Sequence, residues 1–410
     1  MGRASRVLPS DRFNDHPGYG LTPQRVVQIY RLAELGLPTQ QCDLFDDIIE
    51  NDAHLRNLFE QRAQAVAGKP WVVQGGGPGE REAQAARALE RAMRDLPVVE
   101  SFEHQLGFNR YGWGATEIDW DVVSFEGRRW VVPVWLASVP ARRFRIDDQD
   151  QLRLLTKDAS LDGEPLAPGK WWVTRRTGGR LARTALTRTA GWLSLFKRNT
   201  TGDWYIYAQK YGLPLTIVTY DEAGDEKAKS VAKKIAEDIS EDGGAVVPKS
   251  IEVKFEAADR NGDSSGTHGG LISFCNRENS KLINGSTLSN DNGDSGGASY
   301  SLGEVHDGVR WESVLYDTER LQESFRVNVA APFLRFNGLD GVATPVLRVQ
   351  VVRDLAPRQR AEIAEIAIRN GLEVSKSQLR QELGFREPID ANDQLKPLAP
   401  AAPPAPGGAP

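Results

Sequence analysis

The sequence contains little cysteine and little histidine. Among its 410 residues are two cysteines, Cys42 and Cys275, and five histidines. Two cysteines cannot build a disulfide framework, and the chain has neither a C-x-x-C pair nor the H-E-x-x-H spacing that is typical of zinc sites. We therefore expect a protein of a reducing compartment that binds no metal and no cofactor.

Long apolar runs are also absent. No stretch approaches the ~18 apolar residues of a membrane helix, and the polar residues 1–20 lack the apolar core of an export signal. The charge is nearly balanced, since 51 Lys and Arg stand against 56 Asp and Glu, a net charge of -5. A surface that grips nucleic acid over a wide area is usually basic, so any DNA contact is expected to be local or weak. These absences predict a soluble protein, made inside the cell, with no membrane partner.

The first part of the chain carries helix signals. At ~100–200 residues per domain, the length predicts two or three structural units. A hydroxyl N-cap, Thr22, precedes Pro23 and opens a helix that ends at Gly36. A second helical stretch covers Gln40–Glu50, and Asp52 then caps a third that runs to Gly68. Three helices are therefore expected before any strand.

From Pro70 the apolar period changes to that of strands. An Ala/Arg/Glu-rich surface helix is expected at Arg81–Leu96. The remaining segments alternate apolar and polar residues and are bounded by turn residues. This pattern indicates an antiparallel sheet carrying helices, which is the α+β fold class. The expected strands are Trp71–Gln74, Thr116–Val123, Arg129–Leu136, Arg143–Ile146, Leu152–Thr156 and Lys170–Thr174.

The second half begins with a small strand–helix–strand pattern between helices. An aromatic helix, a strand, a charged helix and two short strands follow one another, at Trp204–Tyr211, Leu215–Tyr220, Glu226–Ile239, Ala245–Val247 and Ile251–Phe255. A helix is then expected from about Gly270 to Ile283. Later come a long helix at Asp307–Phe325, a strand at Thr344–Val352 and two C-terminal helices, the second opened by Ser375 and Gln378 as a capping box.

Between two of these helices lies Asn284–Gly303, a segment dominated by Ser, Asn, Asp and Gly. Such a composition cannot bury enough apolar area to order itself, and a loop of this length inside a compact chain is usually functional.

The charges are distributed in blocks of opposite sign. From Lys170 to Arg198 there are eight basic residues and no acidic one, which is typical of a solvated face with a subunit contact; a phosphate-contacting surface is the alternative. From Asp221 to Asp242, eight acidic residues stand against four lysines.

No motif provides a convincing catalytic site. Gly293–Gly297 reads Gly-Asp-Ser-Gly-Gly, the nucleophile signature of chymotrypsin-like serine proteases, but a triad also needs a histidine held by a carboxylate. His54 lies in a helical pattern instead, so we interpret the motif as a polar loop and keep a serine hydrolase using Ser295 as the enzyme alternative. Gly243–Ser250 ends like a phosphate-binding loop, but Pro248 stands where the second glycine is required. We therefore expect an assembly component that is not an enzyme.

Several short motifs then carry a family resemblance. They are Asp52–Arg56 with Gly68–Trp71, Tyr111–Trp120, Pro140–Phe144, Phe196–Lys197 with Asp203–Trp204, and Tyr211–Leu215. Each is short, but together and in this order, from about Leu21 to Leu383, they are specific. The chain resembles the portal proteins of Mu-like phages and prophages.

This resemblance implies a portal fold with a wing, a stem, a clip and a crown. It implies a homo-oligomeric ring, dodecameric in the virion, at one capsid vertex, in contact with capsid, scaffold and neck proteins. The large terminase subunit would drive double-stranded DNA through the channel during packaging in the host cytoplasm, and the DNA would later be ejected. Contact with that DNA would be non-specific. A different ring-forming head–tail structural protein, without a DNA channel, is the remaining alternative.

The resemblance also divides the chain into regions. Residues 1–20 form an N-terminal arm, 21–198 the wing, 199–283 the stem and clip with the clip at about 213–262, 284–303 the tunnel loop, 304–352 the post-loop helix and return to the wing, 353–390 the crown helices, and 391–410 a disordered tail.

Two groups of residues become candidates for contacts. Polar and acidic groups let DNA slide where clustered cations would hold it. The tunnel-loop candidates for DNA contact are Ser286, Thr287, Ser289, Asn290, Asn292, Ser295 and Ser299. A mixed-charge rim tunes partner choice and association rate. The clip candidates for terminase docking are Asp225, Glu226, Lys229, Lys233, Glu237 and Asp238.

Overall fold

The computed structural model describes residues 16–211, 215–219, 227, 229–235, 252–256, 264–286, 300–351, 357–373, 375, 379–380 and 383. The chain separates into two compact units, residues 1–351 and 352–410, and each is described by itself.

The three predicted N-terminal helices are confirmed as α1 (Pro23–Glu34), α2 (Thr39–Asn51) and α3 (Ala53–Ala67). The Thr22 hydroxyl accepts from the backbone N–H of Arg25, so the predicted cap forms. The Asp52 carboxylate accepts from the backbone N–H groups of His54 and Leu55 in the first turn of α3, at 3.1 Å each. The apolar side of α3 packs with α2 and with helix α7, described below, in one buried cluster.

Helices α4 (Glu80–Arg94), α5 (Val98–Leu106) and α6 (Phe108–Tyr111) come next. Helix α4 is exposed along its arginines, as expected of a surface helix, and its other side is buried in the main core through Ala85, Ala86, Ala88, Leu89 and Met93. Small side chains allow that close approach. Helix α5 was not predicted. It starts after Pro97 without a side-chain cap, so the sequence carries no strong start signal for it.

The predicted strands form, but not as one sheet. Strands β2 (Trp113–Phe125) and β3 (Arg128–Ser138) make an antiparallel ribbon, and β7 (Trp171–Arg175) pairs with the other edge of β2. The short strands β4 (Phe144–Ile146), β5 (Leu152–Leu154) and β6 (Glu164–Pro165) form a separate sheet. The first strand, β1 (Trp71–Gln74), pairs instead with β10 (Val346–Val349). A local pattern identifies a strand but not its partner.

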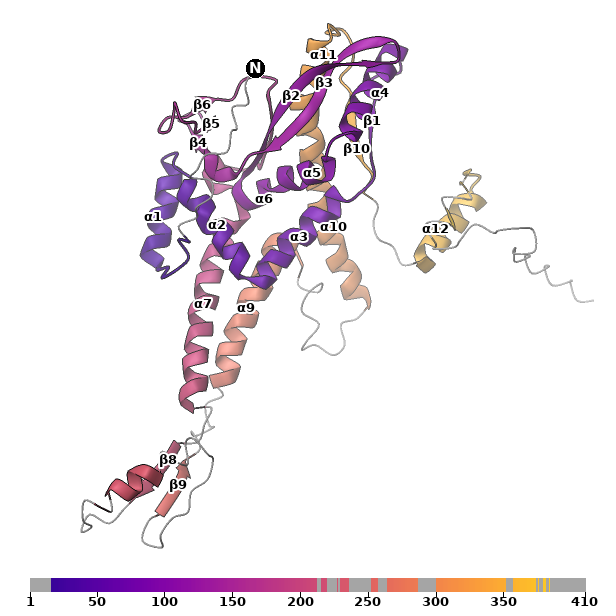
Figure 1. Cartoon of the computed structure of the whole chain (residues 1–410). Helices are drawn as coiled ribbons and strands as arrows, with labels where there is room; N and C mark the ends of the chain where they lie inside the picture. Colours follow the sequence, from indigo (N-terminus) through magenta and orange to yellow (C-terminus); the bar gives the residue numbers. More distant parts are fainter. Residues whose placement is uncertain are drawn as a thin grey trace, which may run out of the picture. The chain divides into compact units, whose positions relative to one another are not determined.

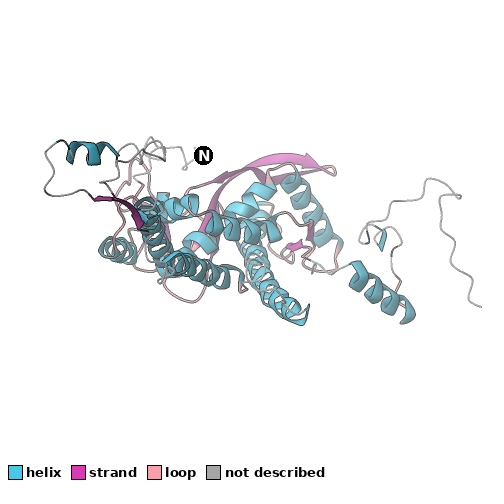
Figure 2. Cartoon of the chain, turned by 90° about the horizontal axis from the view of Figure 1, so that it is seen from below, coloured by secondary structure: helices cyan, strands magenta, loops and turns pink. Residues whose placement is uncertain are grey.

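The longest helices lie in the second half of this unit. Helix α7 spans Leu186–Tyr211 and lies beside α9 (Ser264–Asn284) (Figure 1). Helix α10 (Tyr300–Phe325) continues through a five-residue π-helical turn (Arg326–Ala330) into α11 (Ala331–Phe336). The long β2–β3 ribbon lies along one side of the mainly helical body (Figure 2).

The bounds of these helices correct three expectations. Helix α7 begins at Leu186, 18 residues before Trp204, where the aromatic helix was expected to start. Helix α9 begins at Ser264 rather than at Gly270, and α10 begins at Tyr300 rather than at Asp307. The last four residues of the predicted loop 284–303 are therefore helical, because helix propagation from a packed turn costs less than starting a new helix.

The main core lies where α10 meets the ribbon. Trp172 of β7 packs edge-to-face against Phe325 of α10, with 5.6 Å between ring centroids, and Trp130 of β3 stacks on Phe333 of α11 at 5.7 Å. These rings are almost completely buried. Their packing fixes α10 against the β2–β3–β7 sheet.

Strands β8 (Leu215–Thr219) and β9 (Glu252–Glu256) form the antiparallel pair expected between α7 and α9 in the chain. Residues 229–235 are helical, within the predicted charged helix. The predicted strand Ala245–Val247 lies outside the described residues.

The second unit contains α12 (Pro357–Arg369), the first expected C-terminal helix. Its isoleucines Ile363, Ile366 and Ile368 are exposed. At the second expected helix, the Leu379 N–H donates to the Ser375 carbonyl oxygen at 3.0 Å. Across both units, none of the helices in the described part of the chain is long and apolar enough to span a bilayer.

Candidate functional site

The pair of long helices α7 and α9 is anchored to α3 by a polar cluster. Lys197 of α7 donates to the Asp52 carboxylate and to the Asn276 side-chain oxygen, both at 2.8 Å. The Nε2 atom of His54 lies 3.0 Å from the Asn276 carbonyl oxygen and 3.0 Å from the Ser280 hydroxyl of α9. Asp52 and His54 both belong to the Asp52–Arg56 motif, so the structure gives that motif the role of joining α3 to the helix pair.

The motif Tyr111–Trp120 is likewise occupied with packing. Gly112 has a φ of 96° and lies against the Leu181 carbonyl, where an added Cβ would be 2.7 Å from that oxygen. Gly114 lies against the end of α5, where a Cβ would approach two backbone carbonyl oxygens at 2.6 Å. Buried Glu117 accepts from Lys170 at 2.8 Å. The glycines thus let β2 approach α5 and the residues before α7.

The basic block 170–198 is largely paired inside the subunit. Glu34 of α1 pairs with both Arg183 and Arg188, and the hydrogen bond from Arg183 lowers the pKa of the Glu34 carboxyl. The remaining pairs are Lys170 with Glu117, Lys197 with Asp52, Arg176 with the Asn109 side chain, and Arg198 with the Gly18 carbonyl. These cations have internal acceptors, but Arg183 and Arg198 are still exposed, so the pairing does not remove all of them from the solvated surface.

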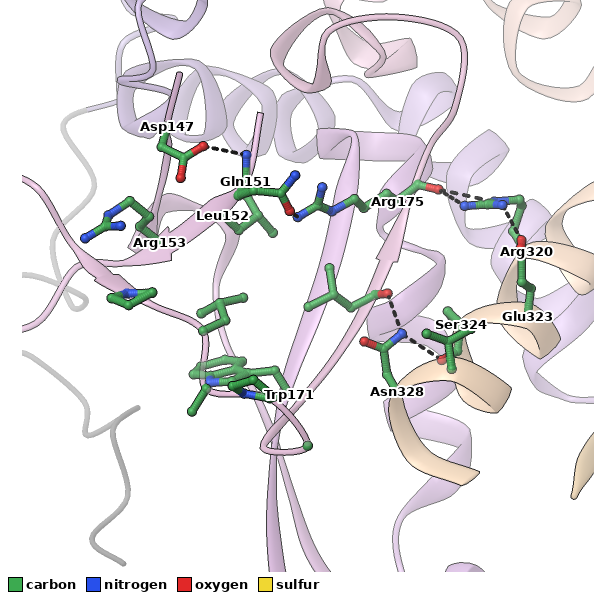
Figure 3. A pocket seen from close by; sticks show the side chains of 17 residues that line it. Asp147, Gln151, Leu152, Arg153, Trp171, Arg175, Arg320, Glu323, Ser324 and Asn328 are labelled. Carbon is green, nitrogen blue, oxygen red and sulfur yellow. Dashed lines mark hydrogen bonds and ion pairs between the residues drawn. The ribbon is translucent and has the colours of Figure 1, made fainter. Parts of the chain in front are cut away.

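An open cavity of about 600 Å³ lies beside β7 (Figure 3). Trp171, Val173 and Arg175 line it from alternate positions of that strand, and Ser324 and Asn328 line it from the end of α10 and the π-helical turn. Arg320 donates to the Arg175 carbonyl at 3.0 and 3.3 Å, and Asn328 reaches the Val173 carbonyl at 3.5 Å. Side chains of the α10 helix and its extension therefore satisfy the outer edge of β7.

The charges around this cavity also have partners. Arg175 donates to the Asp150 carbonyl and the Gln151 side chain, and burial lowers the pKa of its guanidinium. Arg153 donates to two backbone carbonyls of the β5–β6 turn. The lining of the cavity includes the hydroxyl of Ser324 but no histidine. The cavity is thus a recess between packed elements, and no histidine beside Ser324 could act as its general base.

The end of α9 meets α10 closely. Gly285 follows α9 with a φ of 72°, and a Cβ there would lie 2.8 Å from the Val309 Cγ1 atom of α10. Ser286 is buried, so its hydroxyl is not on the surface of the subunit. The other candidates for DNA contact, Thr287, Ser289, Asn290, Asn292, Ser295 and Ser299, lie outside the described residues, as does the whole Gly293–Gly297 motif.

The clip candidates are only partly described. Lys229 and Lys233 lie on the described helical stretch 229–235 and are exposed. Asp225, Glu226, Glu237 and Asp238 lie outside the described residues, and so does the Gly243–Ser250 segment.

Large apolar side chains are exposed on both long helices. On α7 they are Phe196, Trp204, Tyr205 and Ile206, and on α9 they are Leu271 and Phe274. Leu271 and Phe274 lie one turn apart, on the side of α9 away from Asn276, the residue that contacts α7 and α3. Leu271 and Phe274 are thus two neighbouring apolar side chains exposed on the same side of α9.

Sequence reasoning missed the polar residues of α5 and α6. Gln105 donates to the Thr116 hydroxyl at 2.8 Å and to the Trp172 carbonyl at 3.1 Å, and Asn109 bonds to α10. Both side chains are buried amides, and neither belongs to a sequence motif that could have identified it. In the described residues, no group of three or more metal-binding side chains occurs, and Cys42 and Cys275 are both buried as free thiols.

Comparison with known proteins gives consistent results. Residues 42–385 match the family described as the portal protein of Mu bacteriophage. The Mu-like prophage FluMu protein gp29 of Haemophilus influenzae is 28% identical over 345 residues, covering 81% of this chain and 64% of that protein. The portal protein of Escherichia phage Mu is 28% identical over 340 residues, covering 80% and 63%. The chain thus spans slightly less than two thirds of the length of these relatives.

Solved structures share the fold at low sequence identity. A chain in the neck of an empty gene transfer agent (GTA) particle has a TM-score of 0.56 and 14% identity, covering 84% of this chain and 93% of that one. A chain in the neck of the native particle, computed with C12 symmetry, has a TM-score of 0.52 and 16% identity, covering 89% and 94%. The mixed helix and sheet architecture predicted from the sequence is confirmed.

Proposed function

The chain belongs to the family of portal proteins of Mu bacteriophage, and from that premise we propose that it forms a portal ring at one vertex of a phage capsid. Double-stranded DNA is packaged through this ring by a terminase motor and later ejected through it. The observation that carries the proposal is the family match over residues 42–385, which includes α3, the β2–β3–β7 sheet and all three long helices. The ring is a passive conduit, so the subunit is not an enzyme.

The surfaces of α7 and α9 support self-association. A ring needs two different complementary surfaces on each subunit, because each copy contacts its neighbours head to tail. Phe274 and Leu271 lie on the free side of α9, and Tyr205 is exposed on α7 at the edge of a cavity of about 830 Å³ bordered by α2 and α3. We assign these two surfaces to opposite sides of one repeating contact. In the virion the ring is a dodecamer.

The DNA-facing part is the segment between α9 and α10. Residues 287–299 hold Asp291 and Asp294 and no basic residue, so a channel lined by twelve copies is mildly acidic. Such a lining lets phosphates pass without condensing on cations. The internal pairing of the basic block supports this for Lys170 and Lys197, which are mostly buried beside Glu117 and Asp52.

The remaining partners follow from the same role. The clip, with Lys229 and Lys233 exposed on its helical stretch, is the docking surface for the large terminase subunit. Capsid, scaffold and neck proteins contact the ring elsewhere. The subunit assembles in the host cytoplasm and ends in the virion.

Electron microscopy of the purified protein, with light scattering for mass, tests the ring. Rings with a central hole and a mass many times that of the subunit are the expected result. Deletion of Leu288–Ala298 then separates a portal from a ring protein without a DNA channel. The portal predicts intact rings whose particles fail to package or retain DNA, whereas full DNA content would remove the conduit role. A strictly monomeric protein at assembly concentrations would overturn the proposal and make a hydrolase assay with Ser295→Ala worthwhile.

A further inference from the structure

Arg62 of α3 contacts both helices that flank residues 287–299. Its Nε and Nη2 atoms donate to the two carboxylate oxygens of Asp317 in α10, at 2.7 and 3.0 Å. Its Nη1 atom donates to the carbonyl oxygen of Ile283, in the last turn of α9. The Arg62 side chain is 6% exposed and that of Asp317 is fully buried. One guanidinium thus connects three helices.

The contact continues toward the sheet. The Asn109 side chain of α6 donates to Asp317 Oδ2 at 2.9 Å, and its oxygen accepts from Arg176 at the end of β7. The Arg176 guanidinium lies 5.8 Å from the centre of the Tyr316 ring of α10. Burial is the main cause of the lowered pKa of Arg176, and the nearby Arg62 charge adds to it. The two oxygens of Asp317 therefore accept three hydrogen bonds from side chains of two helices, α3 and α6.

Net stability is a poor explanation for this arrangement. Taking an arginine and a carboxylate out of water costs about as much as their attraction returns, and well-packed apolar residues often do as well. A planar guanidinium bound at three nitrogens fixes distance and angle, which apolar side chains do not. The specific result of this arrangement is a defined placement of the end of α9 relative to α10.

A second contact at the same place depends on that placement. Gly285 has a left-handed φ and lies against Val309, so α9 ends within van der Waals distance of α10. Residues 287–299 therefore leave the described fold directly after this glycine contact, and they rejoin it at Tyr300, nine residues before Val309 in α10.

We propose that Arg62 is a positioning residue that sets the spacing between α10 and the end of α9, from which residues 287–299 continue. This inference rests on the proposed function for its biological consequence, because those residues then face the DNA. Its structural content is independent of that function. Loss of Arg62 releases the end of α9 from α10 while the core around Trp172 and Phe325 stays packed.

Amide hydrogen exchange on purified protein tests the inference. Arg62→Met keeps a long unbranched side chain and removes the charge. In this variant, amide exchange at residues 281–286 and 308–318 is expected to rise at least about tenfold. Residues 23–51 and 113–125 are expected to keep their wild-type rates. Arg62→Lys, which keeps the charge but not the three-point contact, is expected to show the same local change. Arg56→Met, on the same helix with an exposed Glu60 partner, is the matched control and changes neither region.

A disulfide provides the rescue that a general structural role would not. The Cβ position at 285 and the γ position at 309 are 2.8 Å apart, close to the separation of those atoms across a disulfide. A cysteine at position 285 is strained at the left-handed φ of Gly285, so the reference for Arg62→Met carrying Gly285→Cys and Val309→Cys is the same protein in dithiothreitol. Oxidation is expected to slow exchange at 281–286 relative to that reduced protein. A rise in exchange spread evenly over α1, α2 and β2, or no rise at all, overturns the inference. If Arg62→Met does not fold, Arg62→Lys and Asp317→Asn carry the same comparison.

DNA content of particles separates this inference from the proposed function. If the inference and the function both hold, Arg62→Met forms rings of wild-type mass whose particles retain at least about tenfold less DNA. If local exchange rises but the particles keep their full DNA content, Arg62 does place α9, and that placement has no role in packaging. Absence of rings in the wild-type protein would remove the proposed function alone.

Discussion

Lys197 of α7 donates to the carboxylate of Asp52 at 2.8 Å, and the same carboxylate caps the N-terminus of α3. One acidic side chain thus serves as the start signal of a helix and as the anchor of the long helix pair. This double use gives the Asp52–Arg56 motif a physical reason.

Replacing Asp52 separates its two roles. Asp52→Ala removes the cap and leaves a mostly buried lysine without its carboxylate, so the free energy of unfolding is expected to fall by about 2–4 kcal/mol. Asp52→Asn keeps a capping oxygen and loses the charge, so its loss is expected to be smaller. Urea unfolding measures both. Equal losses in the two variants would mean that the cap contributes nothing, and Arg56→Ala, in an exposed ion pair, is the control without a measurable effect.

Two glycines are expected to respond in opposite directions to the same substitution. Gly114→Ala places a methyl group 2.6 Å from two carbonyl oxygens of α5, which must move, so a loss of about 1–3 kcal/mol is expected. Gly202 lies within α7 with no atom within 4 Å of an added Cβ, and Gly202→Ala is expected to gain about 0.5–1 kcal/mol. Thermal unfolding of the pair checks this. A neutral Gly114→Ala would show that β2 and α5 are not in close contact.

His104 predicts a pH dependence of stability. Burial lowers the pKa of its ring, whose Nε2 atom donates to the Ala115 carbonyl at 2.9 Å. Below about pH 6.5 the unfolded chain binds a proton that the folded chain does not, so this contribution is complete above that pH and is lost as the pH falls toward the folded pKa. In His104→Asn, whose amide still reaches a donor position but does not titrate, the stability difference from wild type is expected to shrink as the pH falls. Unfolding midpoints between about pH 8 and about pH 5 measure it, and a pH-independent difference would contradict the assignment.

The exposed apolar side of α9 predicts an assembly defect. Phe274→Asp places a charge on the surface assigned to the neighbouring copy, so ring mass is expected to fall toward that of the subunit while the circular dichroism spectrum is unchanged. Leu161→Asp makes the same kind of change at an exposed leucine between β5 and β6, away from α7 and α9, and serves as the matched control. Rings of normal mass in Phe274→Asp would exclude this side of α9 from the contact.

The helices that could be predicted are those whose signals are local. Thr22 and Asp52 form the predicted caps, and Leu321, Phe325 and Val329, placed on one stripe by their spacing, are all buried. A cap or a helical stripe depends on residues within a turn or two of one another, so it can be predicted from the local sequence. The family could be predicted for a similar reason, since short motifs in a fixed order survive in the sequence whatever surrounds them.

The missed features depend on residues far apart in the chain. Helix α5 is held by burial of Phe102 and Leu106 in the core rather than by a cap. The internal partners of the basic block were missed because Glu34 and Asp52 precede it by more than a hundred residues. Arg62 and Asp317 are 255 residues apart, and nothing near either one marks the pair.

The sequence by itself determined the helices with local caps, the α+β class, the strands other than β6 and the family, because each is written in short-range periodicity or in ordered motifs. Only the tertiary structure decided which strands pair, which charges are neutralised within the subunit and where α9 ends against α10. Those outcomes are set by burial and by contacts between distant segments, and the free energy of such a contact belongs to both partners and cannot be read from either one alone.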